Sequence, residues 1–294
     1  MMVQMVVRPA SADDRDAVLE FCENTWEWGD YIEHVWDNWL NDANGRLFVA
    51  VVDERPVGLT HIQMMSETEA WLEGLRVDPR YRKRGLAREL NLAAQAEAMR
   101  RGATTVRLAV EAKNTRSRHL SESNHMREVG AFSLYVAPLL DAPRQGVRER
   151  TQVATLQDLD AIIDYLNLSN IFPIVGGLYY VGFAAREITA AFLEEKIEAG
   201  RVYFLRRWEQ IDGMAIAEQR YEFEQQRLSV GYIDGTAIEA ISLMAYDLHW
   251  RLSEMKLEAV RIYAPDLVLV RDALGGLDYA SNGSVFYTYE RELV

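Results

Sequence analysis

Residues 71–87 read WLEGLRVDPRYRKRGLA, an apolar stretch followed at once by a basic turn and the start of a helix. The first backbone N–H groups of a helix have no acceptor inside the helix, and the helix dipole adds positive potential there. Gly85 allows a bulky anion to approach the main chain closely. The segment therefore predicts an anion-binding loop, to which four side chains add positive charge: Arg82, Lys83, Arg84 and Arg88.

Strands and helices alternate on both sides of this segment. Apolar patterning predicts strands at 3–10, 46–53, 58–65, 70–77, 104–112 and 131–136. Helical spacing predicts helices after Ser11, at 31–40, from Leu86 to Gly102 and at 116–127. This order predicts an α/β or α+β domain with one central sheet, in which the strands between 46 and 77 form an antiparallel meander.

The same order begins again after Pro138, Pro143 and Gly146, which predict a linker. Segments of the first half have counterparts about 155 residues further on. GRLFVAV at 45–51 matches GRVYFLR at 200–206, WLEGLRVDP at 71–79 matches LSVGYIDG at 228–235, and the segment from Leu86 to Leu108 matches 237–262. We therefore expect two copies of one fold, in domains 1–142 and 147–294, with the second copy diverged.

Composition narrows the class of protein. The 294 residues carry a net charge of −13, which opposes binding to nucleic acid or anionic membranes and tolerates a cationic amine. The sequence has no run of about 18 apolar residues, and its start, MMVQMVVRPA, lacks the features of a secretory signal. Cys22 is the only cysteine. We expect a soluble cytoplasmic protein without disulfides, as a monomer or homodimer.

The basic turn also carries a family resemblance. R82-K-R-G-L-A87 is similar to the coenzyme A signature [RQ]-x-x-G-x-[GA] of the GNAT superfamily of N-acetyltransferases, and the resemblance covers roughly residues 5–138. It implies tandem GNAT folds, each a largely antiparallel mixed sheet flanked by helices, and acetyl-CoA as the cofactor. The implied cofactor-binding residues are Leu75, Arg76, Val77, Arg82, Lys83, Arg84, Gly85, Leu86, Ala87, Arg88 and Asn114.

Within the superfamily, two stretches resemble the branch that contains histidine N-acetyltransferases. They are G29-D-Y-I32, followed by Trp36 and Trp39, and L72-E-G-L-R-V-D-P79. L-E-G-x-x-V is also similar to aminoglycoside 6′-acetyltransferases. Both groups act on small amines, so the resemblance implies transfer of an acetyl group to a small primary amine such as an amino acid, by direct attack in a ternary complex.

Acyl transfer to an ammonium group requires a base. Glu73 is the predicted base because it lies on the strand before the basic turn, and Glu111 is the second candidate. The general acid is open, because Ser121 stands where the family pattern places a tyrosine. Ser123 and Tyr135 are further candidates, and departure of the thiolate without a protein acid is the remaining alternative.

Aromatic and acidic residues between 26 and 39 are candidates for the acceptor pocket, since they suit a cation. Trp36 and Trp39, spaced three apart on a helix, are better explained as core residues. Tyr31 is therefore the predicted substrate-binding residue, together with Glu73. His61, on a strand, is predicted to be a packed or surface imidazole. No His or Cys cluster has metal-ligand spacing, so we expect no metal.

The second half departs from the first where the basic turn would be. It reads D234-G-T-A-I-E239-A, and acids at that place oppose a diphosphate. We therefore expect no cofactor site there, and residues 175–183 are a candidate wall of the acceptor pocket. Two other functions stay open: a non-catalytic acetyl-CoA sensor or partner module, and an acetyltransferase of protein N-termini or lysines.

Overall fold

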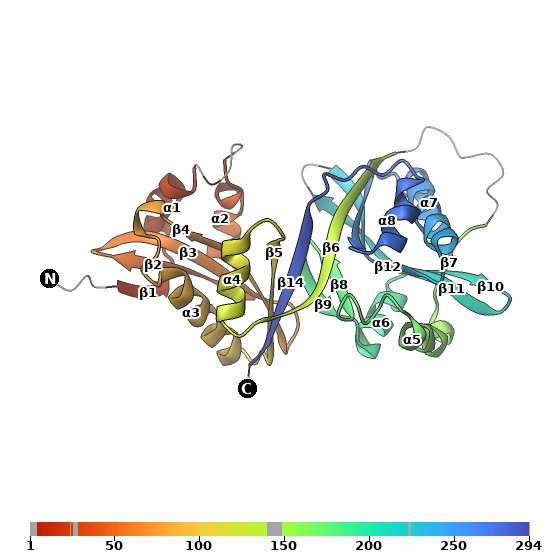
Figure 1. The fold of residues 1–294 in the computed structure, drawn as a ribbon, viewed down its shortest axis with the longest axis horizontal. Helices are drawn as coiled ribbons and strands as arrows, with labels where there is room; N and C mark the ends of the chain where they lie inside the picture. Colours follow the sequence, from red (N-terminus) through yellow and green to blue (C-terminus); the bar gives the residue numbers. More distant parts are fainter. Residues whose placement is uncertain (1–4, 24, 26–28, 140–148, 223–224, 294) are drawn as a thin grey trace. The chain divides into compact units, whose positions relative to one another are not determined.

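The computed structural model describes residues 5–23, 25, 29–139, 149–222 and 225–293. The chain divides into two compact units (Figure 1). Unit 1 comprises Met1–Ala109, Thr115–Arg127 and Tyr289–Val294, and unit 2 comprises Val110–Asn114 and Glu128–Thr288. Pro143 and Gly146 of the predicted linker lie outside the described residues, so the domain boundaries stay a prediction.

Unit 1 includes the last residues of the chain. Leu293 N donates to Thr104 O (2.7 Å), and Arg291 donates to Gln95 (2.8 Å). Arg107 is buried and pairs with both Glu69 and Glu290. The sheet of unit 1 therefore depends on a segment that is almost 200 residues away in the sequence.

Four strands of unit 1 form an antiparallel series, and this confirms the predicted meander. They are β1 (Met5–Pro9), β2 (Gly45–Val52), β3 (Arg55–Met64) and β4 (Glu69–Val77). A fifth strand, β5 (Thr105–Glu111), joins β4 in parallel, and β14 (Val285–Glu292) follows β5 in the strand order. Neighbouring parallel strands need a crossover connection, and the helix at Leu86–Arg100 supplies it between β4 and β5.

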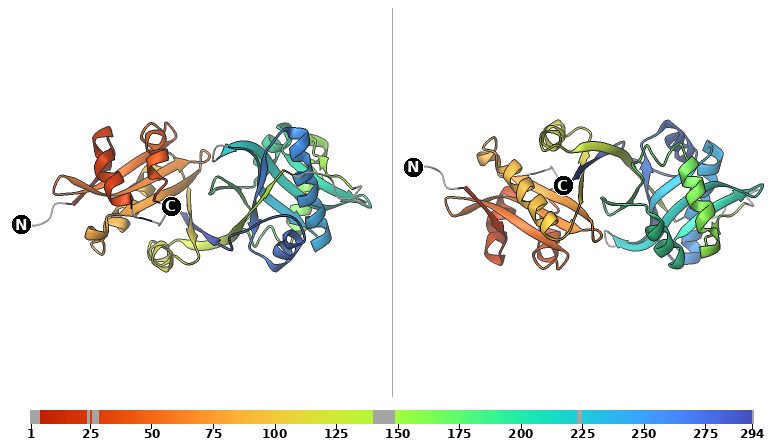
Figure 2. Two further views of the ribbon diagram at one scale, coloured as in Figure 1. Left: turned by 90° about the horizontal axis from the view of Figure 1, so that it is seen from above. Right: turned by 90° about the horizontal axis from the view of Figure 1, so that it is seen from below.

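Helices cover both faces of this sheet, with α1 (Arg15–Cys22) and α2 (Ile32–Leu40) on one face and α3 (Leu86–Arg100) on the other (Figure 2). A short helix, α4 (Thr115–Ser123), follows β5. Trp36 and Trp39 of α2 pack against Leu47, Val49 and Leu59, so both are core residues as predicted. This face of the sheet also carries the candidate base.

Unit 2 is built from the same kinds of element. Its strand order is β6-β13-β12-β11-β10-β7, in which β12 and β13 are parallel and the other described pairs are antiparallel. The strands are β6 (Arg127–Pro138), β7 (Gln152–Val153), β10 (Val202–Arg207), β11 (Gln210–Glu222), β12 (Gln225–Gly235) and β13 (Ala259–Pro265). The fold is therefore α/β with a mostly antiparallel sheet in each unit, as expected.

The remaining elements of unit 2 pack on this sheet. The helices are α5 (Leu159–Leu168), α6 (Ala190–Glu198), α7 (Ile238–Met255) and α8 (Val268–Gly275), and a hairpin joins β8 (Leu178–Val181) to β9 (Ala184–Glu187). Across the part of the chain that the structure describes, no helix is both long and apolar enough to cross a membrane.

Candidate functional site

A bulge in β4 lies at the centre of the candidate site. The register with β3 shifts between Leu59 and His61, so β4 has one residue more than its partner there. Gly74 lies in this stretch with φ +68°, and a Cβ on it would be 2.4 Å from the Trp39 ring. Glycine is therefore required at this position both for its backbone conformation and for its close contact with α2.

The far end of β4 diverges from β5. Parallel pairing joins Glu69–Trp71 to Thr105–Arg107, whereas β4 continues to Val77. The main chain around Leu75 and Val77 therefore lies in the part of β4 that follows this pairing. An extended ligand arm can bind such a strand edge through main-chain hydrogen bonds, which fits the predicted place of the pantetheine chain.

The basic loop, defined here as Arg82–Arg88, follows β4 and leads into α3. Asp78 directly follows β4 and accepts hydrogen bonds from the main chain (2.9 Å) and side chain of Arg80. Burial alone would raise the pKa of Asp78, and the bonds from Arg80 outweigh it and lower the pKa. Asp78 is therefore an ionised anchor at the start of the turn.

The backbone of the basic loop suits an anion. Lys83 and Gly85 both have positive φ, +62° and +84°, and a Cβ on Gly85 would meet nothing within 4 Å. Gly85 is the N-cap of α3, whose first N–H groups have no acceptor one turn back. Open space, free donors and the helix dipole coincide here, so the loop fits the diphosphate of coenzyme A.

The basic loop has one buried apolar side chain and an exposed positive surface. Leu86 is buried in the core below the loop. Arg82 donates to Val77 O (3.2 Å), and the Arg84 guanidinium lies over the Tyr81 ring at 5.1 Å. The charged residues of the loop are exposed, namely Arg82, Lys83, Arg84 and Arg88.

Glu73 lies directly before the bulge on the face covered by α2. Its side chain is 26% exposed, and its Oε1 is 3.0 Å from Nδ1 of His61. His61 is fully buried, with its ring stacked on Trp39 at 4.7 Å. The packed imidazole is thus as predicted, but its contact with the predicted base was missed. The pairing of two strands at 58–65 and 70–77 could have indicated it.

Arg76 and Tyr31 form a second group beside β4. Arg76 pairs with Asp30 through Nε (2.8 Å), and its guanidinium lies over the Tyr31 ring at 5.3 Å. Burial raises the pKa of the Tyr31 hydroxyl. The side chain of Arg76 is thus engaged within unit 1 and its main chain pairs with Leu59 of β3, so its predicted cofactor contact stays a prediction. Tyr31 also meets Trp39 edge to face at 6.1 Å.

The other predicted site residues lie in different places. Ser121 is buried and donates to Ser117 O (3.0 Å) inside α4, and Ser123 donates to Leu120 O in the same helix. Such back-bonding engages their hydroxyl protons. Cys22 is buried, and burial raises the pKa of its thiol to about 12, so it is not an activated nucleophile.

Three predicted residues belong to unit 2. Glu111 accepts a hydrogen bond from Ser284 (3.0 Å), and the main-chain N–H of Asn114 donates to Glu111 O. Tyr135 lies on β6, where burial raises the pKa of its hydroxyl. Their roles toward the cofactor or the acceptor stay predictions.

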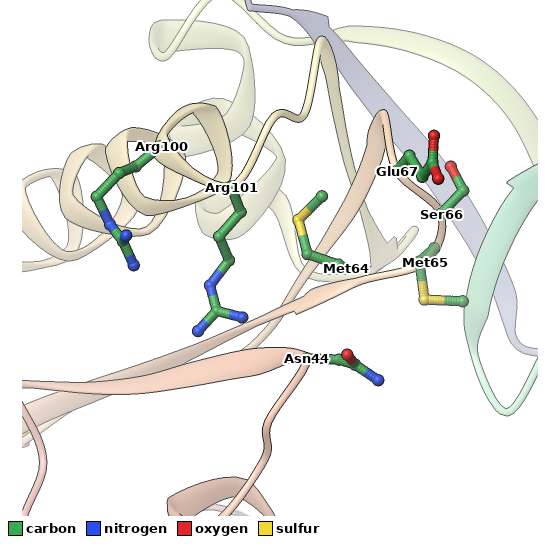
Figure 3. A pocket seen from close by; sticks show the side chains of 7 residues that line it. All are labelled: Asn44, Met64, Met65, Ser66, Glu67, Arg100 and Arg101. Atoms are coloured by element: carbon green, nitrogen blue, oxygen red, sulfur yellow. The ribbon is translucent and has the colours of Figure 1, made fainter.

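A broad surface hollow of unit 1 lies at the opposite end of α3 from the basic loop (Figure 3). It is lined by Asn44, Met64, Met65, Ser66, Glu67, Arg100 and Arg101. Since α3 has 15 residues, the two ends are about 20 Å apart. This hollow is therefore separate from the basic loop.

Comparisons with known proteins agree with this geometry. Residues 16–125 match the acetyltransferase (GNAT) family. The fold is similar to an N-acetyltransferase from Sphaerobacter thermophilus, with a TM-score of 0.61 and 14% identity over 98% of this chain and 95% of that one. No curated protein sequence matches the chain.

A second similar structure is a glucosamine N-acetyltransferase region of a fungal multi-domain enzyme. Its TM-score is 0.63 at 11% identity, over 99% of this chain and 38% of that one. At sequence identities of 11–14% these two structures show similarity of fold alone, and the similarity extends over both units.

Proposed function

We propose that this chain, an acetyl-CoA-dependent N-acetyltransferase of the GNAT type, transfers the acetyl group to the primary amine of a small molecule such as an amino acid. Glu73 is the base in this proposal. The observation that carries it is the position of Glu73, a partly exposed carboxylate directly before the β4 bulge and nine residues before the basic loop.

The mechanism assigns each step to groups of this chain. Bound acetyl-CoA supplies the reactive thioester, held by the basic loop and the far end of β4. Glu73 takes a proton from the acceptor ammonium, which frees the nitrogen lone pair for attack on the acetyl carbon in a ternary complex. No residue forms a covalent intermediate, in agreement with the inert thiol of Cys22.

The surroundings of Glu73 favour a small cationic acceptor. The Glu73 carboxylate supplies negative charge, and Tyr31 supplies aromatic surface beside Trp39 of the core. One face of Tyr31 is already covered by Arg76, so an acceptor would use its other face. The resemblance of residues 29–32 and 72–79 to the histidine N-acetyltransferase branch supports an amino acid as acceptor.

Unit 2 is proposed to be a degenerate second GNAT-like repeat without a cofactor loop. Two features support this. The register of β12 shifts at Gly231, the residue that aligns with Gly74, and α7 follows β12 as α3 follows β4. However, the connection before α7 is short, and the buried Asp234 stands near the end of β12 that leads into it.

A thiol-release screen tests the proposed function. Purified protein and acetyl-CoA are incubated with free amino acids, polyamines, aminoglycosides and amino sugars, and free coenzyme A is measured. We expect amine-dependent release with at least one small acceptor. Tight binding of acetyl-CoA without release for any amine would favour the sensor alternative, and release with peptides alone would favour a protein acetyltransferase.

A further inference from the structure

We propose that His61 is a positioning residue that holds the Glu73 carboxylate and shares with it the proton taken from the acceptor, while Asp42 holds the imidazole from its other side. This inference rests on the proposed role of Glu73 as the base. It adds two residues to the reaction, neither of which touches the acceptor.

The geometry places one imidazole between two carboxylates. His61 Nδ1 is 3.0 Å from Glu73 Oε1, and Nε2 is 3.3 Å from Asp42 Oδ2. The second contact is at ion-pair distance but outside hydrogen-bond geometry. Because the carboxylates face opposite nitrogens, the three side chains do not converge on one point as metal ligands would.

The surrounding residues hold this arrangement in place. His61 is fully buried, and the Trp39 ring stacks on it with the two planes within 4°. A Cβ on Gly45 would be 2.2 Å from Asp42 Oδ2 and 2.7 Å from His61 Nε2, so Asp42 and His61 can approach each other only beside a glycine. Leu47, which lies opposite His61 on β2, is apolar. The ring of His61 contacts the carboxylates of Glu73 and Asp42.

The loop that carries Asp42 is also fixed. Asn44 N donates to Asp42 Oδ1 (2.8 Å), and Arg101 donates to the carbonyl oxygens of Ala43 (3.0 Å) and Gly45 (2.6 Å). Figure 3 shows the Arg101 side chain extending from the end of α3, with Asn44 on the opposite side of the hollow. Asp42 is thus held at a defined position, although its side chain is 18% exposed.

The number of protons on the three side chains determines how well they can accept another one. A neutral imidazole has one N–H and one lone pair, so it can donate to one of two ionised carboxylates but not to both. One added proton, on His61 Nδ1 or on Glu73 Oε1, provides a donor for each contact. The three side chains therefore gain a charge-assisted contact when Glu73 accepts a proton, and this favours the transfer.

The step balances without another reactant. One N–H bond of the acceptor ammonium breaks, and its proton is bound between Glu73 Oε1 and His61 Nδ1. The freed lone pair forms the C–N bond as the C–S bond of the thioester breaks, with the electron pair leaving on sulfur. A second N–H bond of the attacking nitrogen then breaks and its proton passes to that sulfur, which gives the neutral amide and the free thiol. The first proton returns to solvent from Glu73, which is partly exposed.

The test compares the variants Glu73→Gln, His61→Asn, Asp42→Asn and the double variant of His61 and Asp42 in the full-length protein. Asparagine at 61 keeps a donor near the place of Nδ1 but cannot take up a proton. We expect His61→Asn and Asp42→Asn each to lower kcat about ten-fold, with the acceptor KM changed less than about two-fold. The double variant should be no slower than the slower single variant, because the residues act as one unit. In both single variants the fall of kcat/KM in acid should move to lower pH.

His119→Asn, on the exposed side of α4, is the matched control and should behave as the wild type. An assay-independent readout is the ¹⁵N spectrum of histidine-labelled protein, in which Glu73→Gln and Asp42→Asn should each shift the His61 ring signals. A His61→Asn variant that folds and keeps wild-type kcat and pH profile would overturn the inference. Wild-type turnover of Glu73→Gln would instead overturn the proposed base, so the two failures are distinguishable. If His61→Asn does not fold, the inference is tested by the kinetics of Asp42→Asn and by the ¹⁵N spectrum. Wild-type kcat of Asp42→Asn together with unshifted His61 ring signals would then overturn it.

Discussion

The two units share a strand with a bulge at a glycine, but the chain that follows differs between them. In unit 1, Gly74 packs against Trp39. In unit 2, Gly231 packs so closely on Tyr179 and Tyr180 that a Cβ would be 2.1 Å from the main-chain carbonyl oxygen of Tyr180. Both strands then lead into a long helix. The common geometry therefore belongs to the fold, and the chemistry depends on the residues around it.

The connections after the two strands have opposite electrostatics. In unit 1, residues 78–85 separate β4 from α3 and expose basic side chains, whereas in unit 2 only Thr236 and Ala237 separate β12 from α7. Asp234 is 1% exposed and accepts hydrogen bonds from Tyr232 and Ser169. We therefore expect no diphosphate binding at the start of α7, because a helix N-terminus needs open space and a favourable sign of charge as well.

The largest expected effect is on the basic loop. Gly85→Glu should weaken acetyl-CoA binding at least about 100-fold, or about 2.7 kcal/mol, because it adds bulk and negative charge where the diphosphate would lie. The positive φ of Gly85 adds strain of about 1–2 kcal/mol, which is small against a typical folding stability of roughly 5–15 kcal/mol. Titration calorimetry measures the affinity, and the wild type should bind about one acetyl-CoA per chain.

Two controls accompany this variant. Gly85→Ala has the same backbone strain without the charge and should bind more tightly than Gly85→Glu. Gly275→Glu places the same side chain at an exposed glycine of unit 2 and should leave affinity unchanged. Two equivalent sites in the wild type would contradict the contrast between the units.

The next effect concerns Glu73, which aligns with the buried Val230 of unit 2. Glu73→Gln keeps the size of the side chain but cannot accept a proton, so turnover near neutral pH should fall about 100-fold or more while acetyl-CoA affinity holds. The loss should shrink at high pH, where the acceptor amine is already neutral. Steady-state kinetics across pH measures this, and a raised acceptor KM at constant kcat would show that Glu73 only binds the ammonium.

A smaller effect concerns stability in acid. Hydrogen bonds from Arg100 and Arg101 outweigh burial and hold the pKa of Glu97 at about 2, below its ordinary 4.5. A lowered folded-state pKa stabilises the protein above the ordinary value, and that stabilisation is lost as pH falls from about 4.5 toward 2. Glu97→Gln should therefore flatten the decline of unfolding free energy over this range. Urea titrations at several pH values measure it, and an unchanged slope would contradict the assignment.

The smallest effect is expected at the start of α7. Glu239 is exposed and pairs with Arg207 at 3.2 Å, so Glu239→Gln should change the unfolding free energy by at most about 1 kcal/mol. It should not create a second cofactor site, because Asp234 and the short connection remain. Thermal unfolding and calorimetric stoichiometry are the measurements, and a stoichiometry of two would show that charge alone separates the units.

Local sequence patterns predicted much of unit 1. Apolar runs placed β2, β3 and β4, and helical spacing placed α3, because these elements bury apolar residues in the core of unit 1. The basic loop was predictable because its residues are contiguous and their chemistry is local. The contact between His61 and Glu73 was not predicted, because it depends on the register between two strands and on the bulge at Gly74.

By itself, the sequence determined the order of elements, the position of the basic loop and the class of fold, because each depends on residues close together in the chain. Only the tertiary structure placed Asp42 and Glu73 on either side of His61, and Tyr289–Val294 in unit 1. These contacts join residues 12 to almost 200 positions apart. They form because strand pairing and burial bring distant side chains together, and no local pattern specifies which ones meet.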